Sequence, residues 1–198
     1  RLAALAAIAK PEKVVPAIVE FVDIAGLVAG ASQGEGLGNQ FLSHIRETDA
    51  IVNVVRCFED ENVIHVAGKV DPISDIEVIQ TELCLADLGT VDKTLQRSIK
   101  AAKSGNDKDA AKLVAVLTRV QATLNQGQPV RSIAFSKEEL VVLKPLCLIT
   151  AKPAMFVGNV DEHGFENNPL LDKLKAYADA QKAPVVAICV KTEAEMAE

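Results

Sequence analysis

Four short apolar runs constrain the fold of this chain more than any other feature of its sequence. They span residues 17–22, 50–55, 154–159 and 185–190, and each is apolar on both faces of an extended strand. Helical or glycine-rich sequence separates each run from the next. Strands of this kind are typical of a parallel sheet covered by helices on both faces. The sequence therefore predicts an α/β fold with a mostly parallel sheet.

The segment between the second and third runs has a helical period instead. Apolar residues recur at steps of three and four over residues 75–103, with one shift of register, and again over residues 110–124. A polar turn, Ser104-Gly105-Asn106-Asp107, separates the two stretches. Two amphipathic helices around a short turn predict an antiparallel α-helical hairpin of the coiled-coil type, inserted into the sheet domain. We expect a third, shorter helix over residues 137–143, capped by Ser136.

An aspartate and a glycine follow the first apolar run, and a glycine-rich run comes next. Asp23 follows the run directly, and Gly26 comes three residues later. The glycine-rich run contains Gly30, Gly34, Gly36 and Gly38. P-loop nucleotide hydrolases use this order: the carboxylate holds Mg²⁺ through a water, the glycine amide meets the γ-phosphate, and the segment behind it responds to that phosphate. The pattern predicts a nucleotide switch with Asp23 as the metal residue; the alternative is an ordinary turn at the end of a strand.

Leu27 stands where related GTPases often carry a glutamine that orients the attacking water. A leucine side chain cannot polarise water, so a hydrolase of this type needs another polar group. His65 lies in a polar loop after the second apolar run, at the edge where open α/β sheets bind ligands. An imidazole can orient water, so His65 is the candidate catalytic residue, and a solvated loop histidine is the alternative.

Asn159-Val160-Asp161-Glu162 directly follows the third apolar run. GTPases carry Asn-Lys-x-Asp at this place, and the aspartate accepts two hydrogen bonds from guanine. Here a valine replaces the lysine and the longer Glu162 replaces the aspartate. Adenine offers a donor at N6 but an acceptor at N1, so losing the aspartate removes the device that rejects adenine. The motif favours a purine site that is not built for guanine; the alternative is an ordinary loop at a strand end.

The amino-acid composition limits the kinds of partner that this chain can be expected to bind. The net charge is −6, and Lys and Arg are scattered along the sequence, so no basic patch argues for direct nucleic-acid binding. The longest apolar runs fall well short of the ~20 residues of a membrane-spanning helix. The cysteines, Cys57, Cys84, Cys147 and Cys189, form no Cys-x-x-Cys pair. We expect buried, reduced thiols in a cytoplasmic protein that binds neither a membrane nor a specific DNA sequence.

Taken together, these segments resemble the YchF family of Obg-like ATPases. The resemblance covers essentially the whole chain, including the helical insertion. True Obg GTPases carry proline at the position of Ala25, an Asn-Lys-x-Asp box and no such hairpin. The segments that carry the resemblance are residues 23–31, 34–39, 45–50, 55–58 and 159–162.

The resemblance implies binding and slow hydrolysis of ATP with Mg²⁺, with GTP as the weaker ligand, by a switch protein that associates with the ribosome or a ribosomal subunit. It implies that His65 replaces the catalytic glutamine and that Leu27 is the hydrophobic residue at the former glutamine position. It assigns the adenine box to Asn159, Val160 and Glu162. It assigns the loop that closes over the base to Cys189, Val190 and Lys191.

The resemblance also divides the chain. Residues 1–71 and 150–198 are expected to be two parts of a nucleotide-binding domain, and residues 72–149 the hairpin insertion. The chain contains no Gly-x-x-x-x-Gly-Lys-Ser/Thr and no counterpart of the family's C-terminal β-rich domain. We therefore expect a fragment that alone neither binds ATP tightly nor hydrolyses it. The alternatives are an Obg-type GTPase, which Glu162 disfavours, and a non-catalytic module whose hairpin binds a ribosome or another partner.

Overall fold

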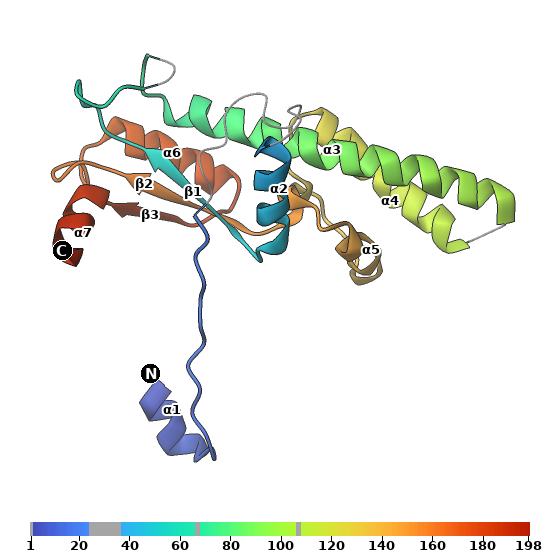
Figure 1. Cartoon of the computed structure of the whole chain (residues 1–198), viewed down its shortest axis with the longest axis horizontal. Coiled ribbons are helices and arrows are strands. Elements are labelled where there is room, and N and C mark those ends of the chain that lie inside the picture. Colours follow the sequence, from blue (N-terminus) through green and yellow to red (C-terminus); the bar gives the residue numbers. More distant parts are fainter. Residues whose placement is uncertain (1, 24–36, 66–67, 106–107) are drawn as a thin grey trace.

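The computed structural model describes residues 2–23, 37–65, 68–105 and 108–198 (Figure 1). Within these ranges, three strands form a parallel sheet in the order β1-β2-β3. The strands are β1 Ile51–Arg56, β2 Ala154–Asn159 and β3 Val185–Ile188. The sheet confirms the second, third and fourth predicted strands, although β3 ends two residues earlier than expected because a helix begins at Val190.

The first predicted strand is wrong for the described structure, because residues 17–22 form no strand. They belong to an extended segment that follows α1 (Leu2–Ala9) and projects away from the body of the molecule in Figure 1. Ile18 is 90% exposed and Phe21 is 81% exposed. A strand is stable only when its backbone groups pair with a neighbour, and no described segment pairs with this one.

Helices cover one face of the sheet in the described part of the chain. α6 (Pro169–Ala180) and the beginning of α3 (Pro72–Gly105) pack there against Val55 and Phe156. The residues that alternate with these along β1 point to the opposite face. On that face Val54 is 65% exposed. The α/β fold with a parallel sheet flanked by helices is confirmed, and within the described residues the face that carries Val54 stays open.

The inserted segment forms the predicted helical pair. α3 and α4 (Lys108–Asn125) lie side by side along most of their length, and α3 runs as one helix through the register shift. At 1.5 Å per residue, α3 is about 50 Å long. Val91, Leu117 and Val120 are fully buried between the two helices. No described helix is both long enough and apolar enough to cross a membrane.

The chain returns from the hairpin to the sheet through short helical pieces. α5 (Lys137–Leu143) begins as predicted at Ser136, whose side chain accepts a hydrogen bond from the Glu139 backbone N–H while the Glu139 carboxylate accepts one from the Ser136 N–H. Three 3₁₀ turns flank it, at Val130–Ser132, Lys144–Leu146 and Ile149–Ala151. This segment is called the return segment below, residues 130–152.

Three of the four cysteines are buried as expected, and the fourth is not. Burial raises the pKa of Cys57 and of Cys84 to about 11, so both thiols stay protonated at neutral pH. Cys147 is exposed, which corrects the prediction. It follows the turn at Lys144–Leu146 in a left-handed conformation with φ 46°, and this turn lies on the surface.

Candidate functional site

The loops after β1 and β2 are joined at the carboxyl edge of the sheet. Asn168 Nδ2 donates to the Cys57 carbonyl at 2.8 Å and to the Gly164 carbonyl at 2.9 Å. The Asn168 Oδ1 atom caps α6 by accepting hydrogen bonds from the backbone N–H groups of Leu170 and Leu171. Sequence reasoning missed this residue, although an asparagine before the proline that opens a helix is a recognisable N-cap signature.

The predicted base-binding residues come together at this edge. Asn159 ends β2, and its Oδ1 atom accepts a hydrogen bond from the Val190 backbone N–H at 3.1 Å. Cys189 is the N-cap of α7 (Val190–Ala197), and its side chain is buried. Val160 is also buried, and its N–H donates to the Ile188 carbonyl at 2.9 Å. The loops after β2 and β3 therefore form one connected site.

The outer part of this site is an ion pair. Lys191 Nζ donates to Glu162 Oε1 at 2.9 Å, and both side chains are exposed. The hydrogen bond and the charge of Lys191 lower the pKa of Glu162, and the same contact raises the pKa of Lys191. The site therefore places a hydrogen-bond acceptor, the Glu162 carboxylate, beside a donor, the Lys191 ammonium group.

The loop after β2 has no room for a side chain at Gly164. A Cβ atom there would lie 2.7 Å from Asp161 Oδ1 and 3.1 Å from Val160 Cβ. The Gly164 N–H donates to the Asp161 carbonyl at 3.1 Å and closes a turn. This tight turn fixes the position of Glu162 and His163 on the exposed side of the loop.

His65 lies at the base of the helical insertion. Its Nε2 atom is 3.0 Å from Asp75 Oδ2, in the first turn of α3. Arg56 supports the loop between β1 and this histidine by donating to the Phe58, Asp60 and Val63 carbonyls, and its guanidinium lies over the Phe58 ring. Asp75 belongs to the insertion and not to the predicted base-binding residues.

The predicted phosphate side is only partly described. Asp23 is exposed at the end of the extended segment, and no hydrogen bond or ion pair among the described residues joins it to Asn159. Gly38 lies in the first turn of α2 (Leu37–Glu47). The other predicted residues here, Gly26, Leu27, Gly30, Gly34 and Gly36, lie outside the described residues.

The described residues contain no group of three or more His, Cys, Asp or Glu side chains that could hold a metal ion. Mg²⁺ does not need such a group, because it usually keeps several waters and binds through one or two carboxylates and substrate phosphates. The single exposed carboxylate of Asp23 is compatible with that way of binding.

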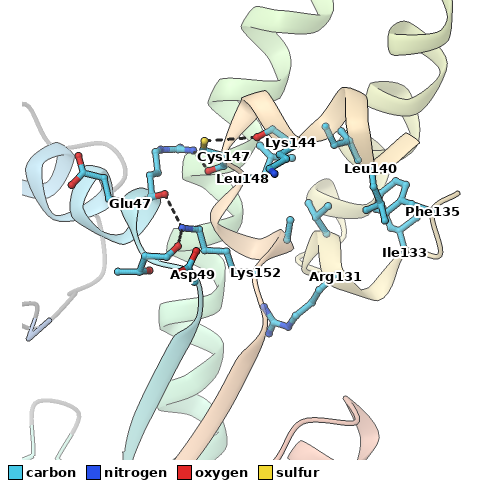
Figure 2. A pocket seen from close by; sticks show the side chains of 15 residues that line it. Glu47, Asp49, Arg131, Ile133, Phe135, Leu140, Lys144, Cys147, Leu148 and Lys152 are labelled. Atoms are coloured by element: carbon cyan, nitrogen blue, oxygen red, sulfur yellow. Dashed lines mark hydrogen bonds between the residues drawn. The ribbon is translucent and has the colours of Figure 1, made fainter. Parts of the chain in front are cut away.

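A groove of about 680 Å³ lies elsewhere, between the end of α2 and the return segment (Figure 2). Its lining includes the apolar residues Phe135, Leu143 and Leu148 and the cations Arg46 and Lys152. It is called the α2 groove below. None of the predicted site residues lines it.

The far half of α3 carries an exposed row of cations. Lys93, Arg97, Lys100 and Lys103 follow one another at steps of four, three and three, so they share one face of the helix. All four are exposed, and no ion pair within the described ranges involves them. This row, called the α3 stripe below, corrects the expectation that Lys and Arg are merely scattered.

The comparisons with known proteins agree with this fold. A profile of the family described as "50S ribosome-binding GTPase" matches residues 9–85. The chain is 54% identical over all 198 of its residues to the Ribosome-binding ATPase YchF of Haemophilus ducreyi. The chain belongs to the YchF family. It is also 47% identical over 201 aligned residues to the Ribosome-binding ATPase YchF of Bacillus subtilis.

A solved structure shows the same family resemblance in three dimensions. The structure titled YchF GTPase of Schizosaccharomyces pombe superposes with a TM-score of 0.78 at 37% identity, over 97% of this chain and 53% of that chain. The chain spans about half the length of the curated relatives it matches, 54% for the first and 55% for the second. The two bacterial relatives are named ATPases, whereas the Schizosaccharomyces pombe structure is named a GTPase. The nucleotide preference must therefore be argued from the site.

Proposed function

We propose that the whole protein is a cytoplasmic, ribosome-associated switch that binds ATP with Mg²⁺ and hydrolyses it, with GTP as a weaker ligand. The observation that carries the choice of ATP is the contact between Glu162 and Lys191 beside Asn159. The gathering of Asn159, Val160, Glu162 and the start of α7 at one sheet edge supports a purine site there, because open α/β sheets bind ligands at the carboxyl ends of their strands.

The ion pair suits adenine better than guanine. Guanine offers two neighbouring donors, at N1 and N2, and a carboxylate must use both oxygens to accept them. In this chain Glu162 Oε1 already accepts a hydrogen bond from Lys191. Adenine offers one donor at N6 and one acceptor at N1, and the carboxylate and the ammonium can satisfy one each. A base that leaves a polar group of the site unpaired is penalised.

Nucleotide affinities of the full-length protein test this proposal. We expect ATP to bind more tightly than GTP, and Lys191→Met to weaken ATP binding by about 10-fold, the loss of one hydrogen bond to a charged group. Glu162→Asp should shift the preference toward GTP. Lys175→Met is the matched control, since Lys175 also pairs with an exposed carboxylate, Asp172, at 3.8 Å. If Lys191→Met binds ATP and GTP with the same affinities as the native protein, the ion pair is not the source of the nucleotide preference.

We assign the hydrolytic role to His65. Asp75 stands within hydrogen-bonding distance of Nε2, so the carboxylate can hold the imidazole in one orientation and fix the proton on that nitrogen. Nδ1 is then the basic nitrogen, and a basic nitrogen is what orienting a water for attack requires. Leu27 cannot perform this task because its side chain has no polar atom.

The α3 stripe supports the ribosomal partner. Four cations over about 15 Å of helix match a chain of phosphates better than a protein surface of mixed charge. Residues 88–105 contain four basic residues and one acid, a charge of +3 in a chain whose net charge is −6. The purely structural alternative, a lid packed on its own domain, would not need an unpaired cationic face. The non-catalytic binding function of the hairpin is thus compatible with the ATPase.

A further inference from the structure

A buried carboxylate lies where the insertion joins the sheet domain. Asp87, in α3, has no exposed surface. It accepts hydrogen bonds from the backbone N–H groups of Ile149 at 2.9 Å and Thr150 at 2.7 Å, and from Thr150 Oγ1 at 2.8 Å. Burial raises the pKa of Asp87, and these hydrogen bonds and the charge of Arg46 oppose that rise. Asp87 therefore fastens the return segment to α3.

Arg46 connects the same place to α2. From the last turn of α2, its Nη1 atom lies 3.5 Å from Asp87 Oδ1 and donates to the Cys147 carbonyl at 3.1 Å. Its Nη2 atom donates to the Ala86 carbonyl at 3.3 Å and to Thr90 Oγ1 at 3.1 Å. One guanidinium thus bridges α2, α3 and the return segment.

Lys152 makes the reverse connection, from the return segment to α2. Its Nζ atom donates to the carbonyls of Ile45 at 2.8 Å, Arg46 at 2.7 Å and Thr48. These carbonyls lie at the carboxyl end of α2, where backbone acceptors have no partner within the helix and where a cation is favoured. Figure 2 shows Lys152 reaching this end of the helix.

We propose that Arg46, Asp87 and Lys152 form a joint that makes the orientation of the hairpin depend on the position of α2. They are positioning residues, and none of them is assigned to the chemistry. α2 begins at the end of the glycine-rich run that the sequence predicts to respond to the γ-phosphate, with Gly38 in its first turn. Through the joint, a nucleotide-dependent shift of α2 is transmitted to the α3 stripe. This step rests on the proposed function.

Packing alone already holds α2 in place, which is why the polar contacts call for a further role. Leu42, Ile45, Leu83 and Ile149 form a buried cluster between α2, α3 and the return segment. A buried charge adds little net stability to such a contact, but it specifies which groups must meet. Arg46 and Lys152 of the joint also line the α2 groove, next to the end of α2 (Figure 2).

The geometry amplifies a small movement. The eighteen residues of α3 between Asp87 and the end of the helix span roughly 27 Å. A rotation of about 5° at the joint would move the far end of the hairpin by roughly 2 Å. Because packed interfaces have discrete arrangements, small shifts at one end of such an element are converted into whole-element movements.

The test measures the distance from the hairpin to the sheet domain in the full-length protein. Spin labels are placed at Lys100→Cys, in the α3 stripe, and at Lys173→Cys, on the exposed side of α6, in a Cys147→Ser background. The distance distribution is recorded without nucleotide and with a non-hydrolysable ATP analogue, whose binding is measured separately by calorimetry. We expect the analogue to shift the mean distance by roughly 2 Å, the lever estimate.

Arg46→Met should abolish this shift without changing the affinity for the analogue more than about twofold, whereas a purely structural role would leave the shift intact. Lys152→Met is the second variant, in case Arg46→Met does not fold. The matched control is Arg119→Met: Arg119 also pairs with a carboxylate, Glu139, and donates to a carbonyl, Ala134, and both of these partners lie outside α2. A full shift in Arg46→Met overturns the joint, as does an unshifted native protein that binds the analogue.

If calorimetry shows that the native protein does not bind the analogue, the proposed function fails. The distance distributions recorded without nucleotide then test whether the joint fixes the orientation of the hairpin. A distribution that is broader in Arg46→Met than in the native protein and in Arg119→Met supports the joint. Equal widths in all three overturn it.

Discussion

The two ends of the helical insertion differ in almost every physical respect. At its base, α3 packs against the sheet, α6 and the return segment, and it carries the buried Asp87 and the contact between Asp75 and His65. At its far end, α3 contacts α4 (Figure 1). The side chains of the α3 stripe are exposed there. One end is fixed by hydrogen bonds to the domain, and the other end is available to a partner. The contrast suits an element that transmits a state rather than one that closes over its own domain.

The strongest test of the contrast between the two ends of the insertion is to remove the buried carboxylate of Asp87. We expect Asp87→Ala to lower the free energy of unfolding by about 3–5 kcal/mol, since it leaves two N–H groups and a hydroxyl without an acceptor and Arg46 without its counter-charge. Urea denaturation measures this change. Asp172→Ala, which removes an exposed carboxylate 3.8 Å from Lys175, is the control and should cost less than about 0.5 kcal/mol. Similar costs for the two variants would show that Asp87 does not fasten the base of the insertion.

The hairpin and most of the sheet could be predicted from the sequence because their signals are local. The 3.6-residue period over residues 75–103 requires no knowledge of distant contacts, and Ser136 with Glu139 forms a capping box within four residues. The family resemblance assigns the adenine-box residues and the start of α7 to one base site. These residues lie together at the carboxyl edge of the sheet, where parallel strands bring their ends. Their role in binding stays a prediction.

The joint could not be predicted, because its members are far apart in the sequence. Arg46 and Asp87 are separated by 41 residues, and Lys152 contacts carbonyls more than 100 residues earlier in the chain. A charged residue in an amphipathic helix normally indicates a solvated face, and nothing local distinguishes Asp87 from such a residue. The strand predicted at residues 17–22 failed for the related reason that strand formation depends on a pairing partner, which apolar composition does not reveal.

A substitution of His65 tests the catalytic role proposed for the end of the insertion that joins the sheet domain. We expect His65→Ala to lower the rate of ATP hydrolysis by about 100-fold, at the lower limit for the loss of a general acid–base group. The nucleotide affinity should remain within about twofold, because the partner of His65, Asp75, lies in the first turn of α3 and not among the predicted base-binding residues. Single-turnover hydrolysis by the full-length protein is the measurement. Asp75→Asn should give a smaller decrease, since it keeps the side chain's shape but removes the charge that orients the imidazole. An unchanged rate in both variants would assign the chemistry to another residue.

The smallest effect on stability, and the most selective effect on function, is expected at the far end. Arg97→Glu together with Lys100→Glu should change the free energy of unfolding by less than about 0.5 kcal/mol, because both side chains are exposed and neither belongs to an ion pair of the described structure. The same pair should weaken co-sedimentation with ribosomes and flatten its dependence on salt, since each cation that neutralises a phosphate releases a counterion. The control is Lys173→Glu with Lys182→Glu, which reverses the charge of two exposed lysines on the sheet domain, one in α6 and one just after it. If the α6 pair weakens co-sedimentation as much as the hairpin pair does, overall charge and not the α3 stripe governs the association, and the far end of the insertion loses its distinct role.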